Sequence, residues 1–501
     1  MTRSAFLLLA ATLAAAARKE PVEIGSRLEL FVDDFLVERA DRVRLELHSP
    51  EPAGTVLRFD RPWEGNTSVY VSIVRDDDRY RMYYRASNNP ESIRRAGLRP
   101  GEKVDEDRHQ FIAMAESRDG IAWTRPSLGL FEFRGSRENN IVWVDRPGEQ
   151  RVSDCMFVFK DANPACAPAE RYKALGGSSR PLVALVSADG IHWRELQGQN
   201  SLLTEGLHGN AFDALNVAFW DAARGHYVIV FRDTDNGRRN ETFDSRTTGA
   251  NYGNRSFKVA TSKDFLHWSY PQWVDFGDAP VEHHYTNATT PYFRAPHIYL
   301  SFPKRFMPWR NYFEDPSFAP GASDGVFMSS RDGVHWDRRF PEAFVRPGRD
   351  ERNWGNRSNM AAVGIIPTAA GEISLYYTRN YTFPSAHLER LRLRTDGFVS
   401  AHAPYRGGEL VTRPLRFEGS NLVLNYATSA AGSIRIELQD AAGAPLPGFA
   451  LEDSPLLWGD AIDGVVPWKG VGAKPLERLA GKPVRLRFVM RDADLYSLRF
   501  R

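Results

Sequence analysis

This sequence has few of the features of a membrane protein or of a disulfide scaffold. After the first seventeen residues, no apolar run approaches the roughly 20 residues that a membrane span needs. Only two cysteines occur, Cys155 and Cys166, which is too few for a disulfide framework. A pair across a hairpin and two unpaired thiols remain alternatives for them. No segment has the apolar spacing of a long helix, so an all-β chain is expected.

The charges are balanced and are not concentrated in blocks of one sign. The chain has 65 basic and 63 acidic residues. A nucleic-acid-binding protein usually concentrates basic residues on one face, so we predict no nucleic-acid partner. We also predict no membrane partner and no cofactor, and the oligomeric state is left open.

The first seventeen residues have the pattern of a secretory signal peptide. Arg3 gives a basic start, residues 5–17 are apolar, and Ala15 and Ala17 form a small-residue cleavage pattern. We predict a cut between Ala17 and Arg18. The mature protein is therefore expected to be exported, to the periplasm or the extracellular space.

A short phrase recurs along the chain at a near-constant interval. Ser117-Arg-Asp119-Gly-Ile-Ala-Trp123 has counterparts that begin at Ser187, Ser262 and Ser330, and a weaker copy lies around Asp396. The five Asp positions are 70, 75, 68 and 64 residues apart. Such periodicity is typical of a repeat fold. Asp can bond to backbone amides, Gly accepts a positive φ and Trp packs, so the phrase predicts a structural turn between two strands.

Each repeat also contains a hairpin with an aromatic-rich strand, such as residues 76–84 and 223–231. Four short antiparallel strands in each repeat predict a propeller blade. We therefore predict a five-bladed β-propeller over residues 18–400, in which residues 18–50 add strands that close the ring. Residues 401–501 alternate strongly and predict a C-terminal β-sandwich.

Polar residues at the starts of the innermost strands would converge on the central funnel. Four consecutive repeats supply one carboxylate each at this position: Glu64, Asp154, Asp213 and Glu282. Carboxylates that face one another raise at least one pKa, which suits an acid and base pair for glycosidic bonds. Each acid has the alternative of a structural role at its strand end.

Aromatic, amide and basic neighbours of these acids suit a carbohydrate partner. The predicted substrate-binding residues are Trp63, Asn66, Asn216, Tyr285, Asn287, Arg294, His297, Trp354 and Arg357. Arg294 and Arg357 would suit an acidic or sulfated sugar. His283, His284 and His297 have a metal site as an alternative, but bonds to sugar or backbone are the more ordinary role, and we predict no metal.

The five repeats, the Ser-x-Asp-x-x-x-Trp phrases and one acid per inner strand resemble the five-bladed glycosidases of glycoside hydrolase families 32 and 43. The segments Leu30–Glu38 and Arg394–Ser400 are similar to those of uncharacterised bacterial family 32-like proteins. The resemblance implies a secreted glycoside hydrolase, and it implies that the C-terminal domain is the sandwich of family 32.

The resemblance also implies roles for three acids, although the sequence departs from the pattern of these families. They carry Asp, Asp and Glu on their first three blades, whereas Glu64 occupies the first position here. The same order occurs one repeat later. By analogy, Asp154 is the base or nucleophile, Asp213 the orienting acid, Glu282 the proton donor and Glu64 the reserve.

Two other functions fit parts of the pattern. A sialidase-like exo-glycosidase would also carry Asp-containing turns, but it would have six blades, an Arg triad and a Tyr nucleophile. A carbohydrate-binding propeller without catalysis would have the same architecture and no activity to lose.

Overall fold

A computed structural model describes residues 20–501, except 94–97, 149–150, 179–180, 199–201, 209–210, 236–252, 314–320, 469–471 and 473–474. The predicted signal peptide therefore lies outside the described residues. The chain divides into two compact units. Unit 1 contains residues 1–48 and 396–501, and unit 2 contains residues 49–395.

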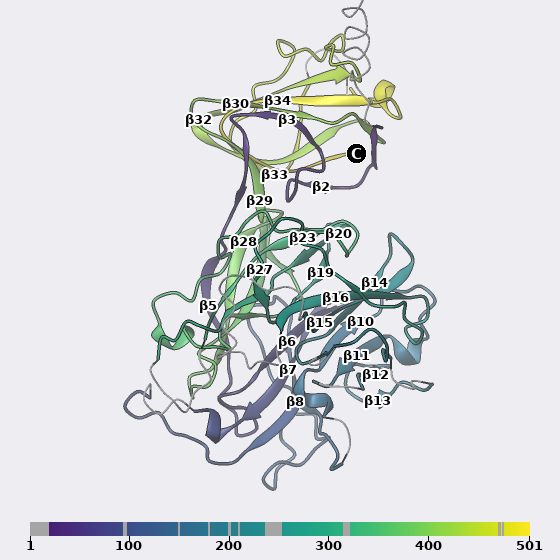
Figure 1. The fold of residues 1–501 in the computed structure, drawn as a ribbon. Helices are drawn as coiled ribbons and strands as arrows, with labels where there is room; N and C mark the ends of the chain where they lie inside the picture. Colours follow the sequence, from purple (N-terminus) through teal and green to yellow (C-terminus); the bar gives the residue numbers. More distant parts are fainter. Residues whose placement is uncertain are drawn as a thin grey trace, which may run out of the picture. The chain divides into compact units, whose positions relative to one another are not determined.

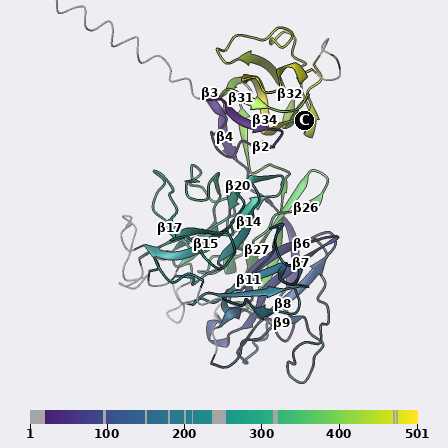
Figure 2. The same ribbon diagram turned by 90° about the vertical axis from the view of Figure 1, so that its right-hand side faces the viewer.

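Unit 2 repeats one plan of four antiparallel strands in chain order (Figures 1 and 2). The first sheet contains β6 (Val69–Asp76), β7 (Arg79–Asn88), β8 (His109–Ser117) and β9 (Ile141–Trp143). The second contains β10 (Phe157–Lys160), β11 (Tyr172–Gly176), β12 (Val183–Ser187) and β13 (Arg194–Glu195). The third contains β14 (Val217–Asp221), β15 (His226–Asp235), β16 (Asn254–Ser262) and β17 (Gln272–Trp273).

The fourth and fifth sheets modify this plan. The fourth contains β19 (Thr290–Tyr292), β20 (Ala295–Ser301), β23 (Met328–Ser330) and β24 (Trp336–Asp337). An additional three-stranded sheet is formed by β18 (His283–His284), β21 (Lys304–Met307) and β22 (Ala322–Gly325). The fifth contains β25 (Met360–Ala361), β26 (Ile366–Ala369), β27 (Glu372–Arg379), β28 (His387–Arg394) and β5 (Glu51–Arg58).

The outer strand of the fifth sheet comes from the beginning of unit 2. β5 pairs antiparallel with β28, with Arg58 opposite His387 and Leu57 opposite Leu388. The segment predicted to close a ring, residues 18–50, lies in unit 1 up to His48. The strand that completes the fifth sheet, β5, lies just downstream.

Unit 1 joins the start and the end of the chain in one ten-stranded sheet. β1 (Val22–Gly25) pairs with β31 (Leu415–Phe417), and β2 (Glu29–Leu30) pairs with β34 (Val484–Phe500). β3 (Val37–Asp41) pairs with β30 (Gly408–Thr412), and β4 (Arg44–Leu47) pairs with β29 (Val399–Ala403). The long β32 (Leu422–Asp440) lies between β34 and β33 (Asp460–Val465). The apolar sides enclose one core, and the sandwich itself stays a prediction.

Four of the five recurring phrases form the same turn. In the first, Ser117 Oγ accepts the Gly120 N–H at 2.8 Å, and Asp119 Oδ1 accepts the N–H groups of Ile121 and Ala122 at 2.8 and 2.9 Å. The same bonds recur after Ser187, Ser262 and Ser330. The structural interpretation of these phrases is thus supported by their geometry.

The fifth phrase has a different backbone geometry, because its positive φ is at Asp396 (62°), whereas in the other four phrases it is at the residue after the Asp. Asp396 belongs to unit 1, where its Oδ2 accepts hydrogen bonds from Asn425 and Ser497 at 3.1 and 2.8 Å. The chain leaves unit 2 here, which explains why the fifth sheet needs β5 as its outer strand. Of the phrase Trp residues, only Trp336 opens a strand itself.

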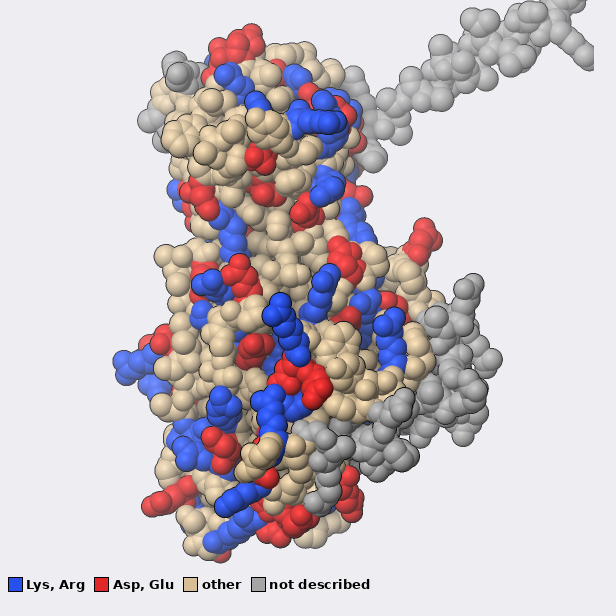
Figure 3. Space-filling model, turned by 90° about the vertical axis from the view of Figure 1, so that its left-hand side faces the viewer, with Lys and Arg blue, Asp and Glu red and all other residues tan. Residues whose placement is uncertain are grey.

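Helical structure in the described residues consists of short 3-10 turns. These are η1 (Pro90–Ser92), η3 (Val152–Asp154), η4 (Pro168–Glu170), η5 (Glu351–Asn353) and η6 (Glu477–Leu479). In this part of the chain no helix has the length and apolarity to cross a membrane. Acidic and basic side chains are interspersed on the face of each unit drawn in Figure 3.

Candidate functional site

A cavity of about 780 Å³ lies where the first two sheets of unit 2 meet the fifth. Its lining includes Arg85 of β7, Asp154 at the end of η3, Arg357 and Tyr381. Asp154 is half-buried, and its two carboxylate oxygens accept hydrogen bonds from Gln110 Nε2 at 2.7 Å and Ser178 Oγ at 2.8 Å. Asp154 is therefore a fixed acceptor in a cavity large enough for a sugar ring.

Asp213 occupies the equivalent position before β14, and its side chain is 46% exposed. It accepts a hydrogen bond from Arg232 on β15, whose side chain is 1% exposed. The preceding residue, Phe212, is fully buried at a φ of 72°. A bulky residue in the left-handed region is strained, and such strain concentrates at functional sites.

Other strained residues lie at the same ends of the strands. Tyr70 at the start of β6, Ala288 before β19 and Asn359 before β25 have φ values of 56°, 46° and 61°. Asn380 and Thr382, just after β27, have values of 53° and 76°. Several residues at the ends of strands in unit 2 thus have left-handed backbone, and Phe212 is directly beside Asp213.

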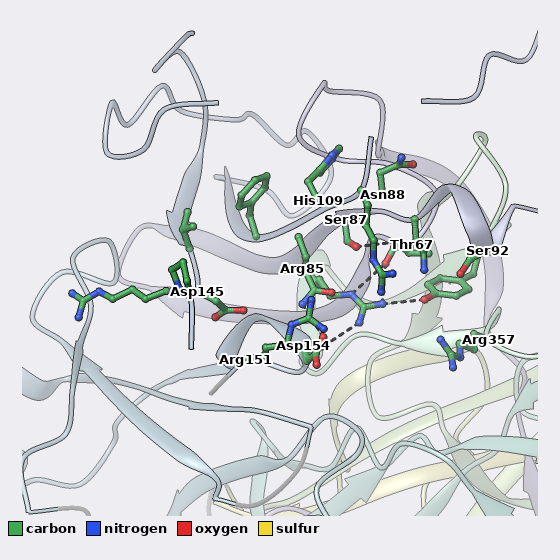
Figure 4. Close-up of a pocket in the computed structure, with 18 of the residues that line it drawn as sticks. Thr67, Arg85, Ser87, Asn88, Ser92, His109, Asp145, Arg151, Asp154 and Arg357 are labelled. Atoms are coloured by element: carbon green, nitrogen blue, oxygen red, sulfur yellow. Dashed lines mark hydrogen bonds between the residues drawn. The ribbon is translucent and has the colours of Figure 1, made fainter. Parts of the chain in front are cut away.

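Arg85 connects the cavity wall to a tyrosine. Its guanidinium donates to the Thr67 carbonyl at 3.0 Å, to the Asp154 carbonyl at 3.2 Å and to the Tyr381 hydroxyl at 3.0 Å. Figure 4 shows Arg85 between Thr67 and Asp154, with Arg357 beside the same space. Burial alone would raise the pKa of Tyr381, but the charges and hydrogen bonds of Arg85 and Arg357 lower it below its usual value.

Tyr285 lies at the centre of several cations. Lys304 Nζ, the Arg232 guanidinium and the Arg255 guanidinium lie 3.9, 4.8 and 5.5 Å from its ring centroid. Burial together with the charges of Arg357, Arg255 and Arg232 lowers the pKa of Lys304 well below its usual value. We call Arg85, Arg232, Arg255, Lys304 and Arg357 the basic cluster.

Glu282 is unsuited to the role of proton donor. It pairs with Arg305 at 2.9 Å and with Arg338 at 3.1 Å, and it lies 3.7 Å from His284. Burial would raise its pKa, but His284 and the two guanidinium groups lower it to about 2. A carboxyl group with this pKa is ionised at neutral pH, so its ion pairs favour a structural role over the predicted role of proton donor.

Glu64 is enclosed in the first sheet and has no exposed side-chain surface. Its carboxylate accepts hydrogen bonds from Tyr84 at 2.5 Å and from Arg125 at 2.8 Å. A ligand has no access to these oxygens, so the structure favours a structural role over the predicted reserve acid.

Three predicted sugar-binding amides are buried, and their nitrogens donate to backbone carbonyls. Asn66 exchanges hydrogen bonds with the backbone of Asn89. Asn216 donates to the Phe212 carbonyl, and Asn287 donates to the Leu215 and Val230 carbonyls. All three are at most 1% exposed, so they brace strand ends and do not present amides to a ligand.

The remaining predicted binding residues divide between the cluster and more distant positions. Tyr285 and Arg357 belong to the candidate site. Trp63 donates to Asn140, and Trp354 donates to the Gly348 carbonyl and stacks on Tyr312. Arg294 and His297 lie at the turn of the β19–β20 hairpin, at the opposite end of the hairpin from Asn287 and Phe302. Arg294 and His297 are therefore not part of this site.

Sequence reasoning missed Arg85, Arg232, Lys304 and Tyr381. Arg85 and Arg232 lie within the last four residues of the second strands β7 and β15, and Lys304 and Tyr381 lie just beyond β20 and β27, whereas the predicted acids precede first strands. A signal was present, because a basic residue follows the aromatic end of the second strand in Tyr84-Arg85, Phe231-Arg232 and Phe302-Pro-Lys304. In an antiparallel hairpin the start of the first strand and the end of the second strand are neighbours.

The cysteines and histidines show no metal or disulfide arrangement. Cys155 and Cys166 are unpaired, and burial raises the pKa of Cys155 to about 12. Among the described residues no group of three or more His, Cys, Asp or Glu side chains is arranged to hold a metal ion. His283 and His284 are buried, and burial lowers the pKa of His283 to about 3.

No protein-family model and no curated protein sequence matches this chain. Among solved structures, one described as "Glycoside hydrolase" has a TM-score of 0.45 and 13% identity, covering 69% of this chain and 92% of its own. A Bacillus subtilis glycoside hydrolase family 43 arabinoxylan arabinofuranohydrolase has a TM-score of 0.38 and 11% identity, covering 88% and 97%. A β-1,2-mannobiose phosphorylase from Listeria innocua has a TM-score of 0.41 and 10% identity, covering 70% and 97%.

These neighbours are enzymes that act on glycosides. The scores and identities are too low to carry an argument about activity, and the family 32-like branch stays a prediction.

Proposed function

We propose that this protein is a secreted glycoside hydrolase that cleaves an oligo- or polysaccharide with Asp154 and Asp213. The observation that supports it is the pair of accessible carboxylates at equivalent strand ends, one of them on a cavity of about 780 Å³. We further propose that the five sheets of unit 2 form a five-bladed propeller and that unit 1 is a β-sandwich.

Asp154 is the better candidate for base or nucleophile. Gln110 and Ser178 fix both of its oxygens without an ion pair, which leaves its charge available to a water molecule or an anomeric carbon. Asp213 is bound to Arg232 and is suited to orient a sugar hydroxyl.

The test is hydrolysis of a broad glycan panel by wild type, Asp154→Asn and Asp213→Asn. The proposal expects a loss of about a hundredfold or more in kcat/KM for Asp154→Asn. Asp119→Asn, in an outer turn, is the control and should retain activity. If the wild type releases no sugar from any glycan but binds one, a non-catalytic carbohydrate-binding protein becomes the better interpretation.

Export is part of the proposal and has its own measurement. Mass spectrometry of protein recovered from the periplasm or medium should give Arg18 as the first residue, and an intact Met1 in that fraction would contradict it.

A sialidase-like exo-glycosidase is a second candidate, and one observation favours it. Tyr381 lines the cavity between two arginines that lower its pKa, as a tyrosine nucleophile requires. Tyr381→Phe separates the two functions. A tyrosine nucleophile predicts a loss of a thousandfold or more, whereas a carboxylate nucleophile predicts less than about tenfold.

A further inference from the structure

The basic cluster has more positive than negative charge around it. Five basic side chains come from β7, β15, β16, β21 and the segment before β25. Only two carboxylates of the described residues, Asp154 and Asp213, lie among them. Asp213 pairs with Arg232, and Asp154 binds Gln110 and Ser178 through its side chain. In the described part of the chain, Arg85, Arg255, Lys304 and Arg357 have no carboxylate within ion-pair distance.

These five cations form one group. Arg232, Arg255 and Lys304 share the ring of Tyr285. Arg357 interacts electrostatically with both Lys304 and Tyr285, and it shares the Tyr381 hydroxyl with Arg85. The charges therefore act on the same small volume.

The cluster is layered by exposure. Lys304 and Arg232 are at most 1% exposed and Arg85 is 9% exposed, whereas Arg357 is exposed and lines the cavity. The buried basic groups supply a positive field, and the outer guanidinium of Arg357 lines the cavity, where a ligand can reach it.

Several donors in this group have no acceptor. Arg232 Nε and Nη1 and Arg255 Nη1 are buried and have no hydrogen-bond partner among the described residues. Buried donors are almost always satisfied in native proteins, and a buried, unpaired charge is costly. A bound oxyanion would satisfy these donors and offset the charge.

We propose that the basic cluster is an oxyanion-binding subsite and that the sugar recognised by this protein carries a carboxylate or sulfate group. The inference deepens the proposed function and rests on it for the nature of the ligand. Guanidinium groups bind carboxylates and sulfates through paired N–H donors. The aromatic ring of Tyr285 contacts Arg232, Arg255 and Lys304 and keeps them close together.

The experiment measures binding without turnover, on full-length Asp154→Asn protein. Unfolding temperature is followed against acetate, sulfate and inorganic phosphate, with chloride at equal ionic strength as reference. Glucuronate with glucose, and galactose 6-sulfate with galactose, are the matched sugar pairs. Arg357→Met and Arg255→Met test the cluster, and Arg392→Met, an exposed arginine paired with Glu51, is the control.

We expect acetate or sulfate to raise the unfolding temperature. The charged sugar with the same group should do so at concentrations at least tenfold lower than its neutral counterpart. Each cluster variant should weaken this protection by about 10- to 100-fold, whereas Arg392→Met should keep it. The sugar pair with the larger difference between its charged and neutral members identifies the recognised group as carboxylate or sulfate.

Three results would overturn the inference: equal protection by charged and neutral sugars, equal effects of Arg357→Met and Arg392→Met, or protection by inorganic phosphate alone. The two proposals fail separately. Hydrolysis of neutral glycans by the wild type without oxyanion binding removes only this inference, and oxyanion binding without hydrolysis of any glycan removes only the enzyme.

Discussion

At the scale of single residues, Glu282 is a stabilising anion between Arg305 and Arg338. Glu282→Gln leaves Arg338 without its carboxylate, and the loss of one partner of a buried pair costs about 3–5 kcal/mol. We expect a lower midpoint in urea unfolding at pH 7. A loss of activity with unchanged stability would instead restore Glu282 as a catalytic acid.

The same residue gives a pH dependence. Its folded pKa of about 2 lies below the ordinary value of about 4.3, so its stabilisation is present above pH 4.3 and is lost as the pH falls toward 2. Wild type should therefore lose its advantage over Glu282→Gln across this window. Urea midpoints at pH 7, 4 and 3 measure it, and a constant difference would contradict the assignment.

Lys304 is expected to have the opposite effect on stability. Its side chain is fully buried beside Arg232, Arg255 and Arg357, and among the described residues its ammonium group donates only to the Asn356 carbonyl, at 2.7 Å. Lys304→Met removes a repelled charge and fills a similar volume. We expect the unfolding temperature of ligand-free protein to rise by about 2–4 °C in calorimetry. Ser323→Ala, which removes another donor to the Asn356 carbonyl, is the control and should lower it.

The sequence predicts the position of a polar residue more readily than the partner to which its side chain binds. Asp154, Asp213, Tyr285 and Arg357 can be proposed from the sequence because the starts of strands are visible in it, and their function stays a prediction. The sequence does not show that the amides of Asn66, Asn216 and Asn287 donate to backbone carbonyls, which favours a structural role for them. The role of Glu282 could not be predicted, because Arg305 and Arg338 reach it from distant segments.

At the scale of elements, β5 determines whether the fifth sheet is complete. Leu57 is 3% exposed, lies opposite Leu388 and packs in a core that includes Phe59, Tyr376 and Leu388. Leu57→Ala should cost about 2–5 kcal/mol. Thr55→Ala, at an exposed position of the same strand, should cost little. Denaturant unfolding of unit 2, followed by tryptophan fluorescence, measures both, and equal effects would show that β5 does not close the sheet.

The recurring phrase and hairpin predict the four-stranded sheets better than they predict where unit 2 begins and ends. The alternating pattern and the Asp turns predicted four-stranded sheets because both depend on local chemistry. The fifth phrase was misassigned because Asp396 keeps the sequence of the turn but bonds to Asn425 and Ser497 of unit 1. Local sequence cannot show which long-range partner a side chain will choose.

At the scale of the whole molecule, the two units should unfold as separate transitions. Removing residues 1–48 deletes β1–β4 and uncovers their partners in unit 1, while β5 and unit 2 stay intact. We expect calorimetry of this truncated protein to show the unit 2 transition unchanged and the unit 1 transition lowered or lost. A parallel fall of both transitions would contradict the division.

The pairing of β1 with β31 has a consequence for the order of events during synthesis. Val22 lies opposite Leu415, so nearly four hundred residues must be synthesised after the first strand before its partner exists. Unit 2 is in effect an insertion within unit 1, and the pairing of β5 with β28 brings the two halves of the interrupted sequence together. Contacts of such long sequence separation form slowly. Released chains that end shortly after residue 395 should therefore carry a folded unit 2 behind a protease-sensitive N-terminal segment.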